Sequence, residues 1–126
     1  MQLDLRHAAE MNAKRYRENL SFLRGYAAAA DAGRPLSSRY VETAGWVWAV
    51  ERVRADLKAK EPEKEQFFAR LYHLDEPASG TPGRRIEIMK LSLDLNVSPS
   101  TLYKWREMIL ADLLMAAVQV GVLKPF

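Results

Sequence analysis

A short stretch near the C-terminal end of the sequence concentrates side chains that can bind a polyanion. Four hydroxyl side chains, followed by two cations, lie there within about two and a half helical turns: Ser98, Ser100, Thr101 and Tyr103, then Lys104 and Arg106. Such groups donate hydrogen bonds to phosphate oxygens, and a lysine can also reach a guanine edge. Two further cations, Arg84 and Arg85, precede the stretch and suit contacts with a phosphate backbone. Together these residues are the candidate DNA-binding side chains.

Residues for catalysis or metal binding follow no recognisable pattern. The sequence holds no cysteine, which excludes a disulfide framework, a thiolate zinc site and a cysteine nucleophile. It contains neither a glycine-rich phosphate loop nor a nucleophile elbow. Its two histidines, His7 and His73, stand far apart in the sequence. We therefore expect no enzymatic activity, no catalytic residues, no metal and no cofactor.

The candidate residues lie on the second of two short amphipathic segments. The first segment carries its apolar residues on one helical face: Ile88, Leu91 and Leu95. Asn96 and Val97 interrupt this helix, and Ser98 followed by Pro99 is a typical start for the next one. Two such helices joined by a tight turn form the helix-turn-helix pattern, whose second helix lies in the major groove of DNA.

The spacing within the second helix separates an inward face from an outward one. Leu102, Trp105 and Ile109 are predicted to point into the core. The outward face then presents Ser100, Tyr103, Lys104 and Glu107. The same spacing also occurs in helical bundles that never touch nucleic acid, so the pattern alone leaves that alternative open.

The residues of this motif also carry a family resemblance. The matching positions are Leu91, Ser92, Leu95, Val97, Ser98, Ser100, Thr101, Tyr103, Lys104, Trp105 and Arg106, with Val120-Gly121-Val122-Leu123 as the matching end. With these residues, the chain from 84 to 123 resembles the C-terminal helix-turn-helix of phage-encoded regulators of the ArpU/RinA type, which are similar to region 4 of sigma factors. Ser92 replaces the usual alanine and Lys104 the usual arginine. The resemblance implies DNA binding and control of phage late or packaging genes.

Three amphipathic segments precede the motif. Residues 3–31 predict one long helix, which the glycine and proline of residues 32–35 end. A second helix is expected from Ser37 or Ser38 to near Lys60, and a third begins with Pro62 at its first position. On the second helix, Trp46 and Trp48 point to nearly opposite sides, so we expect both to pack against something.

These segments predict an all-α fold, with long N-terminal helices packed on a C-terminal helix-turn-helix that has an extended last helix. Residues 1–74 form a helical part for packing or oligomerisation, residues 75–83 a loop rich in proline and glycine, and residues 84–126 the DNA-binding part. Beyond Glu107 the last helix is apolar on both sides. Ala111, Leu114 and Val118 continue its outward line, and Leu113, Ala116 and Val120 its inward line. Either the N-terminal helices or a second subunit could cover the additional side.

The sequence thus favours a sequence-specific transcriptional regulator, encoded by a phage or prophage, that inserts residues 98–108 into the major groove. Its expected partner is double-stranded DNA, and the further partners considered are RNA polymerase and a second copy in a homodimer. One alternative is a packaging adaptor similar to the small subunit of a phage terminase, and another is a helical protein-interaction module contacting RNA polymerase. No run of 18 apolar residues is present and the start lacks a signal peptide, so we expect a cytoplasmic protein without membrane contact.

The amino-acid composition is compatible with a folded DNA-binding protein but does not by itself indicate DNA binding. The chain has 126 residues, of which 48% are hydrophobic, and this suits one compact domain. The formal net charge is only +3. Anion binding therefore has to come from where the cations lie rather than from their number.

Overall fold

The fold is entirely helical over the residues that the structure describes. The structure is a computed structural model that describes residues 3–30, 38–75 and 88–121. Within these ranges it contains six helices and no strand: α1 (Leu3–Lys14), α2 (Tyr16–Ala30), α3 (Ser38–Lys60), α4 (Pro62–Leu71), α5 (Ile88–Leu95) and α6 (Pro99–Val120). The predicted all-α fold is confirmed. None of these helices is long and apolar enough to cross a membrane.

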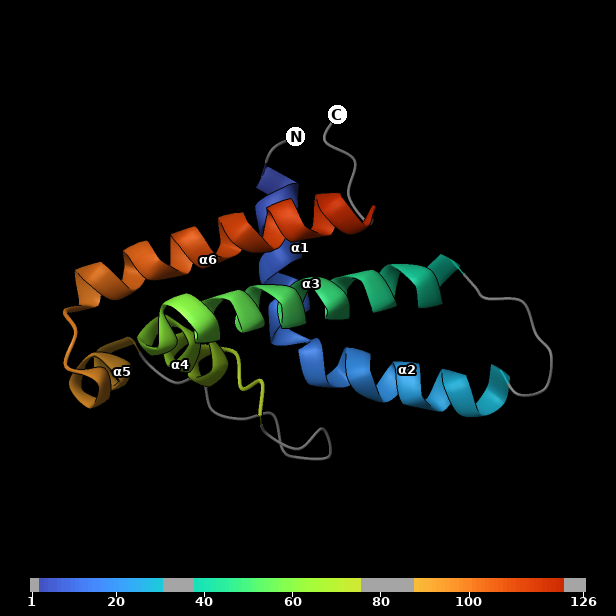
Figure 1. The fold of residues 1–126 in the computed structure, drawn as a ribbon, viewed down its shortest axis with the longest axis horizontal. Coiled ribbons are helices and arrows are strands. Elements are labelled where there is room, and N and C mark those ends of the chain that lie inside the picture. The colour runs from blue at the N-terminus through green and yellow to red at the C-terminus, as the bar shows by residue number, and fades with distance from the viewer. Residues whose placement is uncertain (1–2, 31–37, 76–87, 122–126) are drawn as a thin grey trace.

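Two long helices, α3 and α6, run side by side through the middle of the molecule (Figure 1). α1 crosses both of them, and α2 packs along α3 on the side away from α6. The short helices α4 and α5 gather at the end of the molecule where α6 begins. The last helix is therefore anchored by helices from the N-terminal part.

One continuous hydrophobic core joins all of these elements. Its fully buried side chains include Phe67 and Phe68 of α4, Leu91 of α5, and Leu102 and Leu113 of α6. Buried residues of α1 and α3 belong to the same cluster. The helix-turn-helix segment is therefore packed into the core formed with the N-terminal helices.

The N-terminal segment is not the single long helix that its periodicity predicts. It divides at Arg15 into α1 and α2, which run in clearly different directions (Figure 1). Backbone hydrogen bonds continue through the junction, from Arg15 N to Met11 O at 3.0 Å and from Asn19 N to Arg15 O at 2.8 Å. α1 packs on α6, whereas α2 packs on α3. Tertiary packing thus imposes a bend that a continuous apolar stripe does not reveal.

The predicted extent of the second expected helix and the predicted start of the third are confirmed. α3 starts at Ser38 and ends at Lys60, and Pro62 occupies the first turn of α4. Both tryptophans were expected to pack against another helix or another subunit, and within the described chain only Trp46 does so. Trp46 is only 3% exposed, but Trp48 is 39% exposed, and the Arg52 guanidinium lies 5.7 Å from the centre of its ring. The polar side of α3 faces away from the core, and Trp48 lies there.

The extra apolar line of α6 is covered only in part from within the described chain, since Ala111 is exposed and Leu114 and Val118 are half-buried. α3 and α1 both pack against α6, and they bury Leu110, Leu113 and Ala117. Val120 was expected to point inward but is 39% exposed, because it is the last residue of the helix. Met108 and Met115 remain about half exposed or more, at 49% and 61%. The N-terminal helices therefore cover only two sides of α6.

Candidate nucleic-acid interface

The turn between α5 and α6 is fixed by local hydrogen bonds. Asn96 follows the last residue of α5 with a φ of 56°, a left-handed conformation that asparagine tolerates better than most residues. The Val97 N–H then donates to the Ser92 carbonyl at 3.1 Å, and the Ser92 hydroxyl donates to the Val97 carbonyl at 2.5 Å. Ser92 is therefore hydrogen-bonded to Val97 through both its carbonyl and its hydroxyl group, and these two bonds hold the turn against α5. An alanine at this position could not make the second of these bonds.

The start of α6 has the cap that the sequence predicts. Ser98 is extended, with φ −63° and ψ 148°, and its hydroxyl oxygen accepts a hydrogen bond from the Thr101 N–H at 3.3 Å. The same hydroxyl donates to the Thr101 hydroxyl at 2.9 Å. Pro99 fills the first turn, where no donor is needed. Ser98 therefore serves mainly to begin the helix, and its hydroxyl also lies 3.3 Å from that of Ser100, whereas Tyr103 and Lys104 lie one turn further along.

The inward face of the motif packs as expected. Leu91 and Leu102 are completely buried, and Ile109 is 2% exposed. Trp105 is half-buried and meets Phe67 of α4 edge to face, with ring centres 6.0 Å apart. This packing fixes the rotation of α6 about its axis. The residues on its opposite side consequently face outward.

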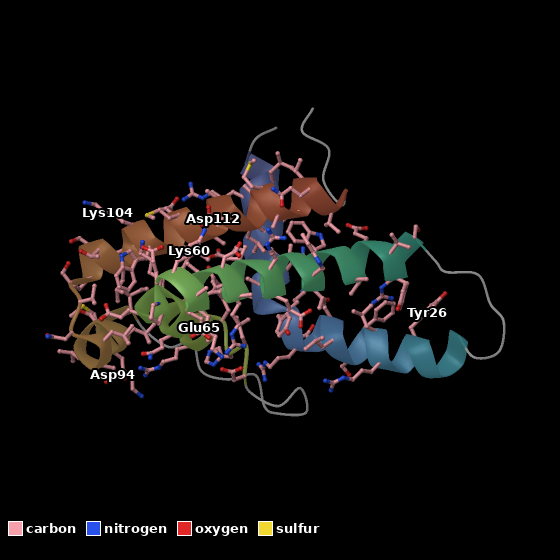
Figure 2. All side chains as sticks on the ribbon, viewed as in Figure 1. Tyr26, Lys60, Glu65, Asp94, Lys104 and Asp112 are labelled. Carbon is pink, nitrogen blue, oxygen red and sulfur yellow. The ribbon has the colours of Figure 1, made fainter. Side chains whose placement is uncertain are left out.

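The outward face at the start of α6 presents the remaining candidate side chains. Ser100, Tyr103 and Lys104 are exposed, and Thr101 is half-buried. Figure 2 shows Lys104 on the outer side of α6 near its beginning. Lys104 forms no ion pair with a carboxylate in the part of the chain that the structure describes. Its ammonium group is thus available to an external anion.

The acidic residue on the same side of α6 is neutralised by neighbouring cations. Arg6 of α1 forms an ion pair with Glu107, and the Arg106 guanidinium lies 3.9 Å from the same carboxylate. Because both partners come from the fold itself, Glu107 opposes an incoming phosphate less than a free carboxylate would. The outward face therefore keeps a positive balance around Lys104.

Arg106 lies in a different position from the other candidates. It is half-buried, and its Nε donates to the Glu10 carboxylate of α1 at 2.9 Å. The Tyr72 hydroxyl donates to the same carboxylate oxygen at 3.0 Å. We therefore assign Arg106 to holding α6 against α1, rather than to the phosphate contact that the sequence suggested.

The protonation equilibria of this network follow from its geometry. Burial disfavours the Glu10 carboxylate, but hydrogen bonds from Arg106 and Tyr72 outweigh it and hold the pKa of Glu10 below its ordinary value of 4.5. Burial and the nearby Glu10 charge raise the pKa of Tyr72 well above its ordinary value. Glu10 is thus ionised and Tyr72 neutral near neutral pH, as their hydrogen bond requires.

A second ion pair holds the first helix of the motif. The Arg70 guanidinium of α4 lies 2.6 Å from the Asp94 carboxylate of α5. Together with the bond between Arg106 and Glu10, this pair attaches each helix of the motif to a different N-terminal helix. Neither pair could be found from the sequence, because the partners are separated by 24 and 96 positions.

Arg84 and Arg85 lie outside the described residues. Across the described ranges, no group of three or more histidine, aspartate or glutamate side chains is placed to hold a metal ion. No protein-family model, curated protein sequence or solved structure matches the chain.

Proposed function

We propose that the protein is a sequence-specific DNA-binding transcriptional regulator, which reads the major groove with the first half of α6. One observation carries the proposal. The helix-turn-helix packs its inward face against the core, with Leu91 and Leu102 completely buried, while the exposed side of the second helix offers two hydroxyl side chains and a lysine that pairs with no carboxylate among the described residues. Such a helix can enter a major groove about 12 Å wide without unpacking the fold.

Each exposed side chain has a chemical role in this proposal. The Lys104 ammonium reaches a guanine edge or a backbone oxygen, and the hydroxyls of Ser100 and Tyr103 donate to phosphates or bases. Thr101 lies at the first turn, beside the backbone N–H groups that start the helix. The net charge of only +3 implies few phosphate contacts, so we expect weak binding to random DNA.

The Lys104→Ala variant tests this proposal. Bound sequences are first selected from randomised duplexes at two salt concentrations, and affinities for the selected duplex are then measured by fluorescence anisotropy. Loss of one direct contact should weaken binding by about 1 kcal/mol, roughly five- to tenfold. The unfolding temperature should stay unchanged, because Lys104 is exposed and unpaired.

The matched control is Arg24→Ala, which removes the same charge at an exposed position on α2. α2 packs on α1 and α3 and makes no contact with α5 or α6. This control should bind the selected duplex as tightly as the parent. Equal losses in both variants would indicate only a general charge effect, and an unaffected Lys104 variant would contradict the assignment of the groove-binding helix.

A second candidate is a helical protein-interaction module that contacts RNA polymerase. The observation in its favour is the outward face of α5, where Met89 is 60% and Leu93 is 80% exposed. An apolar face suits a protein partner better than phosphates. This function requires no DNA binding, whereas the affinity of the proposed regulator for DNA falls as the salt concentration rises.

A further inference from the structure

The second half of α6 exposes an apolar stripe that no described part of the chain covers. Met108 is 49% and Met115 is 61% exposed, Ala111 between them is exposed, and Val118 is half-buried. These four residues, which we call the α6 seam, follow one another at steps of three and four positions. That spacing keeps them on one face, opposite the residues that α1 and α3 bury.

We propose that the α6 seam pairs with the seam of a second copy of this chain, with the two α6 helices antiparallel. The steps of three and four are the spacing of a coiled-coil interface, in which each apolar side chain inserts between residues of the facing helix. The inference concerns association between copies, and it stands independently of DNA binding.

The sizes of the side chains select the antiparallel orientation. In an antiparallel pair whose two-fold axis lies at the level of residue 113, Met115 of one copy faces Ala111 of the other. Met108 of one copy likewise faces Val118 of the other. Large and small residues then alternate across the contact, as close packing requires. A parallel pair would instead set Ala111 against its own copy, which leaves a void, and would bring the two Lys104 ammonium groups together.

A groove beside the seam offers space for the partner's side chains. It has a volume of about 380 Å³, lies between α3 and α6, and has Val53, Leu57, Met115 and Ala116 among its walls. Its rim carries both signs of charge, with Arg52 and Lys60 near Asp56, Glu61 and Asp112. Figure 2 shows Lys60 and Asp112 on the two helices that form it. A rim of mixed charge suits a second copy of itself, because basic groups of one copy can face acidic groups of the other.

Sedimentation equilibrium tests whether the α6 seam forms the contact between the two copies. Three proteins are compared: the parent, Met115→Glu and Met89→Glu. Met89 lies on α5 and is 60% exposed, so its substitution adds the same charge to an equally exposed methionine outside the seam. We expect the parent and Met89→Glu to be dimers at tens of micromolar. Met115→Glu should be monomeric, with association at least about tenfold weaker, because the new carboxylate would be buried in the contact. Thermal unfolding and circular dichroism check that all three proteins are folded.

Cysteine cross-linking tests the orientation, and the chain contains no cysteine of its own. Ala111→Cys is mixed with Met115→Cys under mild oxidation. An antiparallel seam predicts a disulfide between the two different variants, because these positions face one another within the roughly 4.4–6.8 Å Cα separation that a disulfide needs. Cross-linking of Ala111→Cys with itself alone would indicate a parallel pair and overturn the proposed orientation.

The mass measurements can overturn the pairing itself. A parent protein that is strictly monomeric would contradict the proposal, because the α6 seam would then not pair with a second copy. A dimer that persists in Met115→Glu would place the contact elsewhere, and a larger ring would favour a packaging adaptor instead. DNA binding by a monomeric parent would overturn the pairing but leave the proposed function standing, so the two failures can be told apart.

Discussion

At the scale of single residues, Glu10 has the largest structural role among the charged side chains near the motif. Its carboxylate accepts hydrogen bonds from Arg106 and from Tyr72, which follows α4. One acidic group on α1 thereby joins two distant parts of the chain to each other. Because only 18% of the side chain is exposed, water can replace these bonds only in part.

Replacing Glu10 by glutamine should therefore lower stability in a pH-dependent way. The pKa of Glu10 is lowered in the folded protein, so its stabilising contribution is complete above the ordinary value of 4.5 and is lost as the pH falls through the folded value. At pH 7 we expect Glu10→Gln to cost about 1–2 kcal/mol in urea unfolding. The difference from the parent should shrink as the pH falls below 4.5.

The control for this experiment is Glu42→Gln, at an exposed position on α3. It should change the free energy of unfolding by no more than about 0.5 kcal/mol at pH 7. A cost for Glu10→Gln that is the same at pH 7 and pH 3 would show that the carboxylate charge does not hold the helices together.

At the scale of elements, the turn between α5 and α6 decides how the motif is presented. Its geometry depends on the positive φ of Asn96 and on the bonds between Ser92 and Val97. These features are local in sequence, and the same is true of the cap at Ser98 and of the prolines that begin α4 and α6. For this reason the starts of α4 and α6 could be predicted from the sequence alone.

Substitutions at Asn96 test the importance of the turn. Asn96→Ala places a less tolerant residue in the left-handed conformation and should cost about 1 kcal/mol, whereas Asn96→Gly should leave stability unchanged or raise it slightly. Thermal and urea unfolding of both variants measures the difference. If alanine and glycine gave equal stability, the turn would not depend on the conformation of residue 96.

Elements whose shape depends on distant partners could not be predicted. The bend at Arg15 keeps the local hydrogen bonds of a helix, so only the different packing of α1 and α2 produces it. Trp48 is 39% exposed, and its ring meets the Arg52 guanidinium of the same helix. Periodicity identifies the apolar residues, but it does not say which neighbours a particular face will have.

At the scale of the whole molecule, the two functional surfaces proposed here lie on one helix. The first half of α6 turns hydroxyls and Lys104 outward, and the second half turns the seam outward. α1 and α3 pack against other sides of α6, and the ion pair between Arg106 and Glu10 attaches α6 to α1. The last helix therefore acts as a rigid rod that connects the proposed contact with DNA to the proposed contact between copies.

Chemical-shift mapping by NMR tests the central claim most directly. A 14.4 kDa chain is suitable for backbone assignment, and the selected duplex is then titrated into the labelled protein. We predict that the largest amide shifts fall in residues 98–107, at the turn and along the first half of α6. Shifts confined to α2, or to the face of α5 around Met89 and Leu93 with α6 unchanged, would contradict the assignment of α6 to the major groove.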